Sequence, residues 1–219
     1  MIDRLIAASL KLGRGAAGDS ILAWRGEDAY VLSYDRTICI HCWKMGEQTE
    51  EVSFRVCDYE CPKISTDGEW VTFHLADSKI TVPAPVETFK GIAALFSRLK
   101  PAKDNEHPKL ILDRKILRNL SDDLPHIEFV WDGSDSKIIQ RDIYTGKIVE
   151  VAVVPHPHKI EQKPLAIRSA DIFTMFSLGN SFMVTACEDY FHLTDLNKVE
   201  AILGGCLYDD IGKLNVKEE

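Results

Sequence analysis

Four cysteines in the first third of the chain have a spacing that could bind zinc. Cys39 and Cys42 form a C-x-x-C pair, and Cys57 and Cys61 follow with 14 residues between the pairs. Cysteine thiolates at such spacings are the ligands of structural zinc sites. However, residues 36–44 alternate like a strand, which would point Cys39 and Cys42 to opposite faces. We therefore favour buried, apolar cysteines, and a zinc-stabilised β-rich regulatory or interaction domain is the alternative.

Two further patterns match known motifs by letter but lack the structural context that the chemistry needs. Residues 13–18 fit G-x-G-x-x-G, yet they follow a predicted helix and precede a predicted strand, the reverse of a dinucleotide-binding turn. His156 and His158 flank a proline and have no third candidate ligand nearby. No serine-hydrolase, phosphate-loop, zinc-protease or kinase signature occurs. We predict a protein that is not an enzyme, with no catalytic residue, no cofactor and no bound metal.

Short strand-like segments dominate the chain. Apolar and polar residues alternate in them, and turn-forming pairs such as Gly26-Glu27 and Asp132-Gly133 separate several of them. In the first half they are residues 20–25, 28–33, 36–44, 51–57, 69–75 and 78–83, and in the second half 126–131, 136–143, 147–154, 180–187, 189–195 and 198–207. This pattern predicts antiparallel sheets.

Helix-like segments are few and short. Apolar residues recur at helical spacing in residues 2–13, 86–99, 113–120 and 169–177. Asp113 and Ser169 stand where N-capping residues are preferred. We therefore expect four short helices among many strands, which is an α+β fold.

A polar segment near the middle of the chain predicts two domains. Residues 100–108 (KPAKDNEHP) contain two prolines, a composition typical of linkers between domains. We predict an N-terminal domain over residues 1–100, a linker over 101–108 and a C-terminal domain over 109–219.

The order of the predicted elements repeats along the chain. Residues 109–154 and 164–207 each have the pattern strand, helix and three strands. Residues 2–45 lack the leading strand, and residues 51–83 have a shortened piece where the helix would stand. The sequence therefore predicts four βαβββ-type units, two on each side of the linker.

Two segments carry a resemblance to a known family: KLILDRKILRNL at 109–120 and PLAIRSADIFTMFSLGNSFMVTACEDYFHLTD at 164–195. With the fourfold unit, they resemble the sliding clamps of DNA polymerases, which include proliferating cell nuclear antigen and the clamps of T-even bacteriophages. The resemblance implies a sliding-clamp fold, with two similar domains of antiparallel sheets and short helices on one face. The chain length and the reduced second helix are similar to the trimeric phage clamps, which implies a viral protein of DNA replication.

The distribution of charge is compatible with this resemblance. The chain holds 34 acidic and 26 basic residues, a net charge of −8, which excludes a small basic DNA-coating protein. With the residues at their ends, over 2–14, 86–100, 113–120 and 168–177, the helical segments nevertheless hold ten basic and four acidic residues. The candidate DNA-binding residues are Arg4, Lys11, Arg14, Lys90, Arg98, Arg114, Lys115, Arg118 and Arg168. The alternative is that lysine and arginine are simply good helix formers on amphipathic surface helices.

The resemblance also implies a mechanism and a set of partners. A closed homotrimeric ring would encircle duplex DNA without reading its sequence, because basic residues would contact only phosphates. Edge strands would pair between subunits to close the ring. The expected partners are a DNA polymerase, which the ring tethers, and a clamp loader. A monomeric processivity factor with the same fold is a further alternative.

The sequence favours the cytoplasm, which would be the host cytoplasm for a phage-encoded protein. The N-terminal residues do not resemble a signal peptide, and no apolar run reaches the roughly 18 residues of a membrane span. We therefore predict no membrane partner. The six cysteines are expected to be free thiols.

Overall fold

The structure is a computed structural model of the whole chain. It describes residues 4, 5, 8, 20–33, 38–45, 48–56, 63–66, 70–74, 79–83, 88–101, 109–121, 123–131, 135–141, 145, 147–155, 165–187, 189–195, 198–204 and 206–207. The chain divides into two compact units. The first comprises Met1–Lys100 and Asn197–Ile202, and the second comprises Pro101–Leu196 and Leu203–Glu219.

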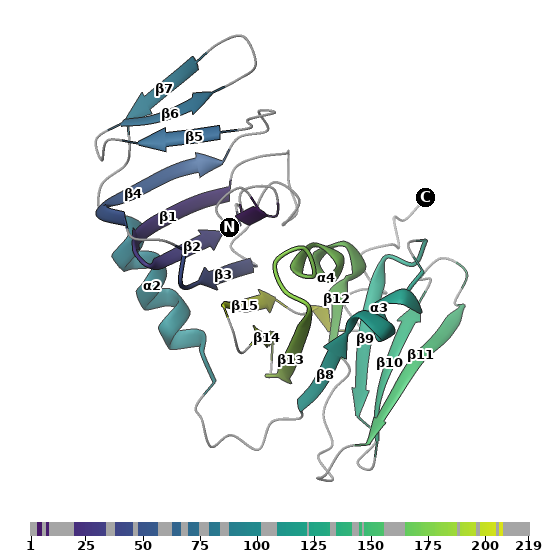
Figure 1. Cartoon of the computed structure of the whole chain (residues 1–219). Helices are drawn as coiled ribbons and strands as arrows, with labels where there is room; N and C mark the ends of the chain where they lie inside the picture. The colour runs from purple at the N-terminus through teal and green to yellow at the C-terminus, as the bar shows by residue number, and fades with distance from the viewer. Residues whose placement is uncertain are drawn as a thin grey trace, which may run out of the picture. The chain divides into compact units, whose positions relative to one another are not determined.

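The first unit contains a twisted sheet with the strand order β4-β1-β2-β3-β15 (Figure 1). Its strands are β1 (Ser20–Gly26), β2 (Asp28–Leu32), β3 (Ile38–Cys42), β4 (Gln48–Val56) and β15 (Val199–Gly204). β1 pairs antiparallel with β2 and β4, and β2 pairs antiparallel with β3. Next to β3, the Trp43 amide donates a hydrogen bond of 3.0 Å to the Lys198 carbonyl. Segments at opposite ends of the chain therefore meet in one unit.

The turn from β1 to β2 occurs at the predicted Gly26-Glu27 pair. Gly26 has φ +59°, in the left-handed region that side chains with a Cβ rarely adopt. Glycine at this position lets the chain reverse tightly enough to pair Arg25 with Asp28. The register that follows places Ala23 opposite Tyr30 and fixes which side chains share a face.

Both faces of the β2–β3 region are buried. Tyr30 and His41 lie opposite each other on one face, while Val31 and Ile40 lie opposite each other on the other. α2 (Thr88–Leu99) covers the first face: the ring of Phe96 contacts those of Tyr30 and His41. Val31 and Ile40 are fully buried on the second face. The sheet is therefore the middle layer of this unit.

A second sheet of the first unit has three strands. β5 (Lys63–Thr66), β6 (Trp70–His74) and β7 (Lys79–Pro83) pair antiparallel in the order β5-β6-β7. Thr72 and Thr81 lie opposite each other, with their hydroxyl oxygens 3.1 Å apart. In this order β7 is an edge strand.

The second unit shows the predicted repetition of elements. β8 (Lys109–Asp113), α3 (Arg114–Arg118), β9 (His126–Trp131), β10 (Asp135–Arg141) and β11 (Ile148–Pro155) form one set. β12 (Leu165–Arg168), α4 (Ser169–Met175), β13 (Ser181–Ala186) and β14 (Tyr190–Asp195) begin the next set. Along the chain its third strand is β15, already described with the first unit, and the short β16 (Cys206–Leu207) follows. One sheet has the order β11-β10-β9-β12-β16, and β13 pairs antiparallel with β14 on one side and with β8 on the other.

Aromatic side chains fill the core of the second unit. The rings of Phe129 and Phe191, both fully buried, have centroids 4.9 Å apart. Phe176, just after α4, meets Phe182 on β13 edge to face at 5.4 Å. Such ring pairs contribute roughly 0.5–1.5 kcal/mol beyond the area that they bury. α4 is thereby fixed to the sheet that β13 belongs to.

Candidate nucleic-acid interface

α3 begins at Asp113, as the sequence predicted. The Asp113 carboxylate accepts hydrogen bonds from the amides of Lys115 (2.8 Å) and Ile116 (2.9 Å), and its backbone is extended at φ −123°. These bonds satisfy two amides that have no partner inside the helix. The Asn119 amide closes the other end by donating to the Ile116 carbonyl at 3.0 Å. A five-residue helix is thereby held in one position after β8.

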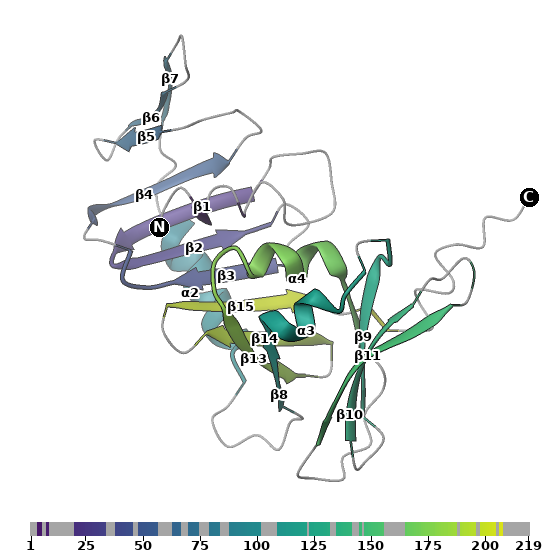
Figure 2. The ribbon, with the colours of Figure 1, turned by 45° about the vertical axis from the view of Figure 1, so that its right-hand side comes forward.

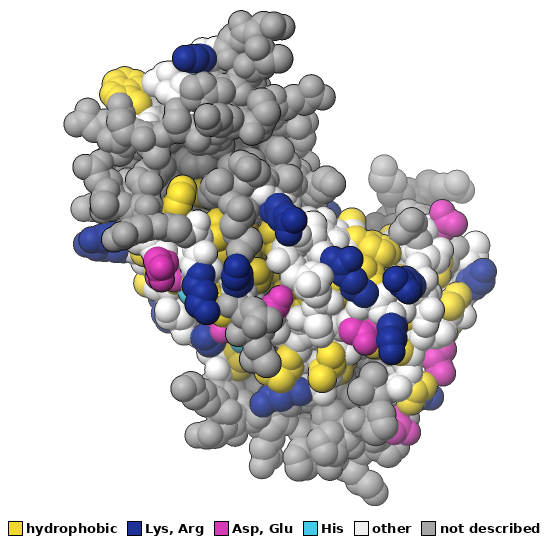
Figure 3. All heavy atoms as spheres, in the orientation of Figure 1, with side chains coloured by type: hydrophobic (Ala, Val, Ile, Leu, Met, Phe, Trp, Pro, Cys, Tyr) yellow, Lys and Arg dark blue, Asp and Glu magenta, His cyan; other side chains and the backbone are white. Residues whose placement is uncertain are grey.

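α3 presents three cations to solvent. Arg114, Lys115 and Arg118 are all exposed, and the helix has no buried residue. Among the described residues, none of the three cations forms an ion pair. Figure 3 shows Lys and Arg side chains gathered over the area that α3 and α4 occupy in Figure 1. Unpaired, exposed cations on a fixed backbone can bind phosphate oxygens without competition from a neighbouring carboxylate.

Arg168, by contrast, already has a carboxylate partner. Its Nε lies 2.8 Å from Asp171 Oδ2 and its Nη2 lies 2.6 Å from Asp171 Oδ1. This two-point pairing spans one turn at the start of α4, and Asp171 is buried. Arg168 therefore contributes less free positive charge to the surface than the residues of α3.

The predicted capping role of Ser169 is wrong. The N-cap of α4 is Arg168, which makes no side-chain capping bond. Ser169 lies in the first turn, where its hydroxyl donates to the Leu124 carbonyl at 2.6 Å. Its own amide donates to the Pro125 carbonyl at 2.9 Å. Ser169 therefore binds the helix to the segment that contains Leu124 and Pro125. Because its hydroxyl is used in this contact, it does not cap the helix.

A buried glutamine joins the segment after α3 to the start of α4. Gln140 on β10 is fully buried, and its Oε1 accepts the Ser121 amide at 2.7 Å. Its Nε2 donates to the Ser121 carbonyl at 2.9 Å and lies 3.4 Å from the Ser169 hydroxyl. Inside a protein such a polar group is costly unless it is satisfied. The network therefore holds α3 and α4 in a fixed relation within the second unit.

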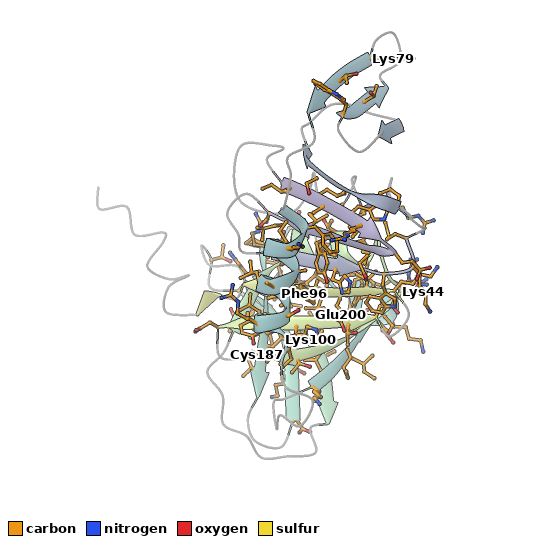
Figure 4. The ribbon with its side chains drawn as sticks, turned by 90° about the vertical axis from the view of Figure 1, so that its left-hand side faces the viewer. Lys44, Lys79, Phe96, Lys100, Cys187 and Glu200 are labelled. Carbon is orange, nitrogen blue, oxygen red and sulfur yellow. The ribbon has the colours of Figure 1, made fainter. Side chains whose placement is uncertain are left out.

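The candidate basic residues of the first unit belong to its N-terminal segment and to α2. Arg4 is exposed beside the buried Leu5 and Ala8, whereas Lys11 and Arg14 lie outside the described residues. Figure 2 shows α2 behind β1 and β2. In Figure 4, from the other side, α2 lies in front of the strands.

The two candidates on α2 are Lys90 and Arg98. Both are exposed, and Arg98 Nε lies 3.4 Å from the Ala94 carbonyl on its own helix. Lys100, just beyond the helix, binds both carboxylate oxygens of Glu200 at 2.7 and 2.8 Å (Figure 4). The positive charge at this end of α2 thus serves partly to dock the helix against β15.

An aromatic cluster lies between α2 and the sheet. The rings of Tyr30 and His41 stack with centroids 4.4 Å apart and an angle of 7°, and Phe89 meets Tyr30 edge to face. His41 Nε2 lies 2.9 Å from Asp28 Oδ1. Burial raises the pKa of Tyr30 to about 12, with the charge of Asp28 acting in the same direction. The cluster is a packed set of rings with polar atoms at its edges. Its ring contacts hold α2 against the sheet.

The zinc alternative is not supported. Cys39 and Cys42 on β3 lie three residues apart, so they point to opposite faces of the sheet. Both are buried free thiols, and burial raises the pKa of each to about 12. A zinc ligand must be a thiolate. Cys57 and Cys61 lie outside the described residues, within which no cluster of three metal-binding side chains occurs.

Sequence reasoning missed two residues that shape this surface, Asp171 and Gln140. The spacing of Arg168 and Asp171, three residues apart on a helix, was a usable signal for an ion pair. Gln140 gave no such signal, because its partners lie 19 and 29 residues away along the chain. A polar residue in an alternating strand pattern is ordinarily assigned to the solvent face, whereas this one is buried.

The solved structures that the chain resembles share one fold. No protein-family model and no curated protein matches the chain. Among solved structures, the Helicobacter pylori beta clamp bound to a DNA ligase peptide matches with TM-score 0.58 and 11% identity, covering 94% of this chain and 63% of that one. The DNA polymerase III beta subunit of Pseudomonas aeruginosa matches with TM-score 0.62 and 10% identity, covering 94% and 63%. That of Thermotoga maritima matches with TM-score 0.57 and 12% identity, covering 93% and 61%.

The chain therefore has the sliding-clamp fold, with antiparallel sheets and a few short helices, as the sequence resemblance implied. It spans about three fifths of the length of these chains. Within the described residues, no helix is long and apolar enough to cross a membrane.

Proposed function

We propose that the chain is one subunit of a ring that encircles duplex DNA and tethers a DNA polymerase, acting by binding and not by catalysis. The observation that carries the proposal is α3. Its Arg114, Lys115 and Arg118 are exposed and unpaired within the described residues, on a helix whose start and end are both capped. The sliding-clamp fold of the chain supports the same proposal.

The proposed mechanism is diffuse attraction between these cations and the phosphate backbone. Contacts to phosphates carry no sequence information, so a ring held only by them can move along the duplex. Their strength falls with salt, because binding releases counterions from the DNA. The net charge of −8 opposes binding elsewhere on the protein, which favours contact through the basic helices.

The proposed assembly is a homotrimer, loaded onto DNA by a clamp loader. Identical subunits joined head to tail form a closed ring when the rotation closes. The partners would dock short peptides, and the Helicobacter pylori clamp bound to a DNA ligase peptide supports this mode of binding. Negative-stain electron microscopy of the purified chain tests the ring: closed particles with a DNA-wide hole are expected, and isolated compact particles would contradict it.

Charge reversal on α3 tests the DNA-facing surface. Arg114→Glu, Lys115→Glu and Arg118→Glu together should strongly weaken association with duplex DNA, because three attractive contacts become repulsive. The measurement is duplex binding across a salt series, together with the length of products made by the cognate polymerase. Loss of three phosphate contacts should flatten the slope of log K against log salt by roughly 3.

The matched control is Lys90→Glu with Arg98→Glu on α2. This variant reverses two exposed cations of the first unit and leaves α3 unchanged, so binding through α3 should change much less. If the α3 variant binds DNA and supports synthesis like the wild type, the assignment of α3 to the DNA is wrong. An equal loss in both variants would instead show a general effect of net charge.

A further inference from the structure

The positive charge of Arg168 is neutralised inside the protein, unlike the charges of the three cations on α3. Asp171 uses both of its carboxylate oxygens on this one partner: Oδ2 accepts from Arg168 Nε at 2.8 Å, and Oδ1 accepts from Nη2 at 2.6 Å. The two side chains are only 26% and 10% exposed. An ion pair with two charge-assisted hydrogen bonds is strong, and salt screens a shielded pair only weakly. A phosphate that binds Arg168 must therefore displace a carboxylate.

Arg168 nevertheless lies beside the end of α3. Ser121, three residues beyond Arg118, accepts a hydrogen bond of 2.9 Å at its carbonyl from Nε2 of the buried Gln140. The same Nε2 lies 3.4 Å from the hydroxyl of Ser169, the residue that follows Arg168. One side chain therefore separates the start of α4 from the segment that ends α3. A duplex whose phosphates contacted α3 would pass close to Arg168.

The stability of the fold gives little reason for an ion pair at this position. Apolar side chains of similar volume often replace a buried ion pair without loss of stability. Other contacts already fix α4: the Ser169 hydroxyl donates to the Leu124 carbonyl at 2.6 Å, and Phe176 packs against Phe182. The pair has a larger effect on the charge of the surface. It neutralises one of the four cations that α3 and the start of α4 carry.

We propose that Asp171 is a positioning residue that limits the strength of DNA binding, because it holds Arg168 away from the phosphate backbone. A protein that moves along a duplex must break and form each phosphate contact again, so an additional strong contact slows the movement. A ring that surrounds the duplex does not need that contact to remain on it. This inference rests on the proposed ring function and adds a device that regulates its DNA-facing surface.

Asp171→Asn in the full chain tests the proposal. Asparagine keeps the shape of the side chain and one oxygen that accepts a hydrogen bond, but it removes the negative charge. A phosphate then competes for Arg168 with a neutral amide and not with a carboxylate. In a salt series, duplex binding should become about five- to tenfold tighter at roughly 0.1 M salt. The slope of log K against log salt should become steeper by about 1, the effect of one added phosphate contact.

Further variants separate this role from a structural one and from a general effect of charge. Asp171→Asn with Arg168→Gln breaks the same ion pair but leaves no arginine to release, so the gain in affinity should disappear. Glu150→Gln removes one negative charge from a surface pair with Lys137 in the same unit, so it should leave the slope unchanged. Circular dichroism verifies folding. If Asp171→Asn does not fold, Arg168→Lys carries the test, because lysine keeps the charge but loses the two-point pairing and should give a smaller gain.

Wild-type affinity and slope in the folded variant that carries the test would overturn the role of Asp171. A gain that persists when Arg168 is replaced as well, or an equal gain in Glu150→Gln, would also overturn it, because net charge alone would then explain the result. These outcomes leave the proposed function intact as long as wild-type binding weakens with salt. Wild-type binding that does not depend on salt would overturn the DNA contact of α3, and the proposed function with it.

Discussion

Gly179 illustrates how tightly single positions are determined in the second unit. A Cβ added there would lie 2.6 Å from the Phe182 ring and 2.7 Å from Asp195 Oδ2. Phe182 is fully buried, so its ring has no free direction in which to move. Gly179→Ala should therefore lower the free energy of unfolding by about 1–3 kcal/mol, the usual cost of overpacking.

Gly91 is the opposite case. Urea denaturation measures the effect of its substitution and of Gly179→Ala. It lies inside α2 and has nothing within 4 Å of an added Cβ. Gly91→Ala should raise the free energy of unfolding by about 0.5–1 kcal/mol, because alanine loses less conformational entropy in a helix. Equal effects of the two substitutions would show that the packing around Gly179 is looser than the structure has it.

The buried thiols of β3 predict a dependence of stability on alkaline pH. Burial raises the pKa of Cys39 and Cys42 to about 12 from an ordinary value of 9.0. A raised pKa in the folded state means that the unfolded chain releases protons first as pH rises. The stability these neutral thiols contribute is complete below about pH 9 and is lost progressively toward pH 12.

The check is urea denaturation at pH 8 and pH 10 for the wild type and for Cys39→Ala with Cys42→Ala. The wild type should lose more stability than the double variant over this range. The variant will be less stable at pH 8, so the comparison is the change with pH and not the absolute value. Identical pH dependence in the two proteins would contradict the thiol explanation.

Individual residues were predictable where their chemistry is local. The N-cap Asp113 and the opposite facing of Cys39 and Cys42 follow from rules that act over two to four residues. Ser169 and Gln140 were not predictable in this way. Their partners come from other elements, and a serine or glutamine satisfies a distant carbonyl as readily as a near one.

At the scale of elements, periodicity predicted most of the strands and three of the helices within about two residues of their bounds. It could not predict which face of a sheet a helix covers. The apolar side of α2 is visible in the sequence, but both faces of the β2–β3 region are apolar. The sequence groups the basic residues of α2 with those of the other helices, and the structure adds that α2 covers the face of the sheet that carries Tyr30 and His41.

The hydrogen-bond network that joins α3 to α4 can be tested by removing the side-chain amide of Gln140. Gln140→Leu keeps most of the side-chain volume but leaves the Ser121 amide and carbonyl without their buried partner. The free energy of unfolding should fall by about 1–3 kcal/mol. Because this network positions the basic helices, DNA binding by the folded variant should also weaken, measured by duplex retention below the unfolding transition.

Lys137→Gln is the control for the glutamine variant, since Lys137 lies on the same strand with its side chain partly exposed, and its surface pair with Glu150 contributes little. It should leave both unfolding and DNA retention nearly unchanged. A Gln140→Leu protein with lowered stability but wild-type DNA retention would show that the network supports the fold without positioning α3.

At the scale of the whole molecule, a ring and a merely basic surface bind DNA in different ways. A basic surface binds any duplex and dissociates as salt rises. A closed ring leaves a linear duplex by sliding off its ends, but on a circular duplex it has no end to reach. The two mechanisms therefore differ in how binding depends on the topology of the DNA, and not only on its charge.

This difference gives the most direct test of the proposed function. The chain, loaded onto nicked circular DNA by its cognate loader, should stay bound through a wash in high salt that removes it from linear DNA of the same length. Cutting the circle with a restriction enzyme should then release it. Equal retention of the wild type on circular and linear DNA would show that the contact is electrostatic and that no closed ring surrounds the duplex.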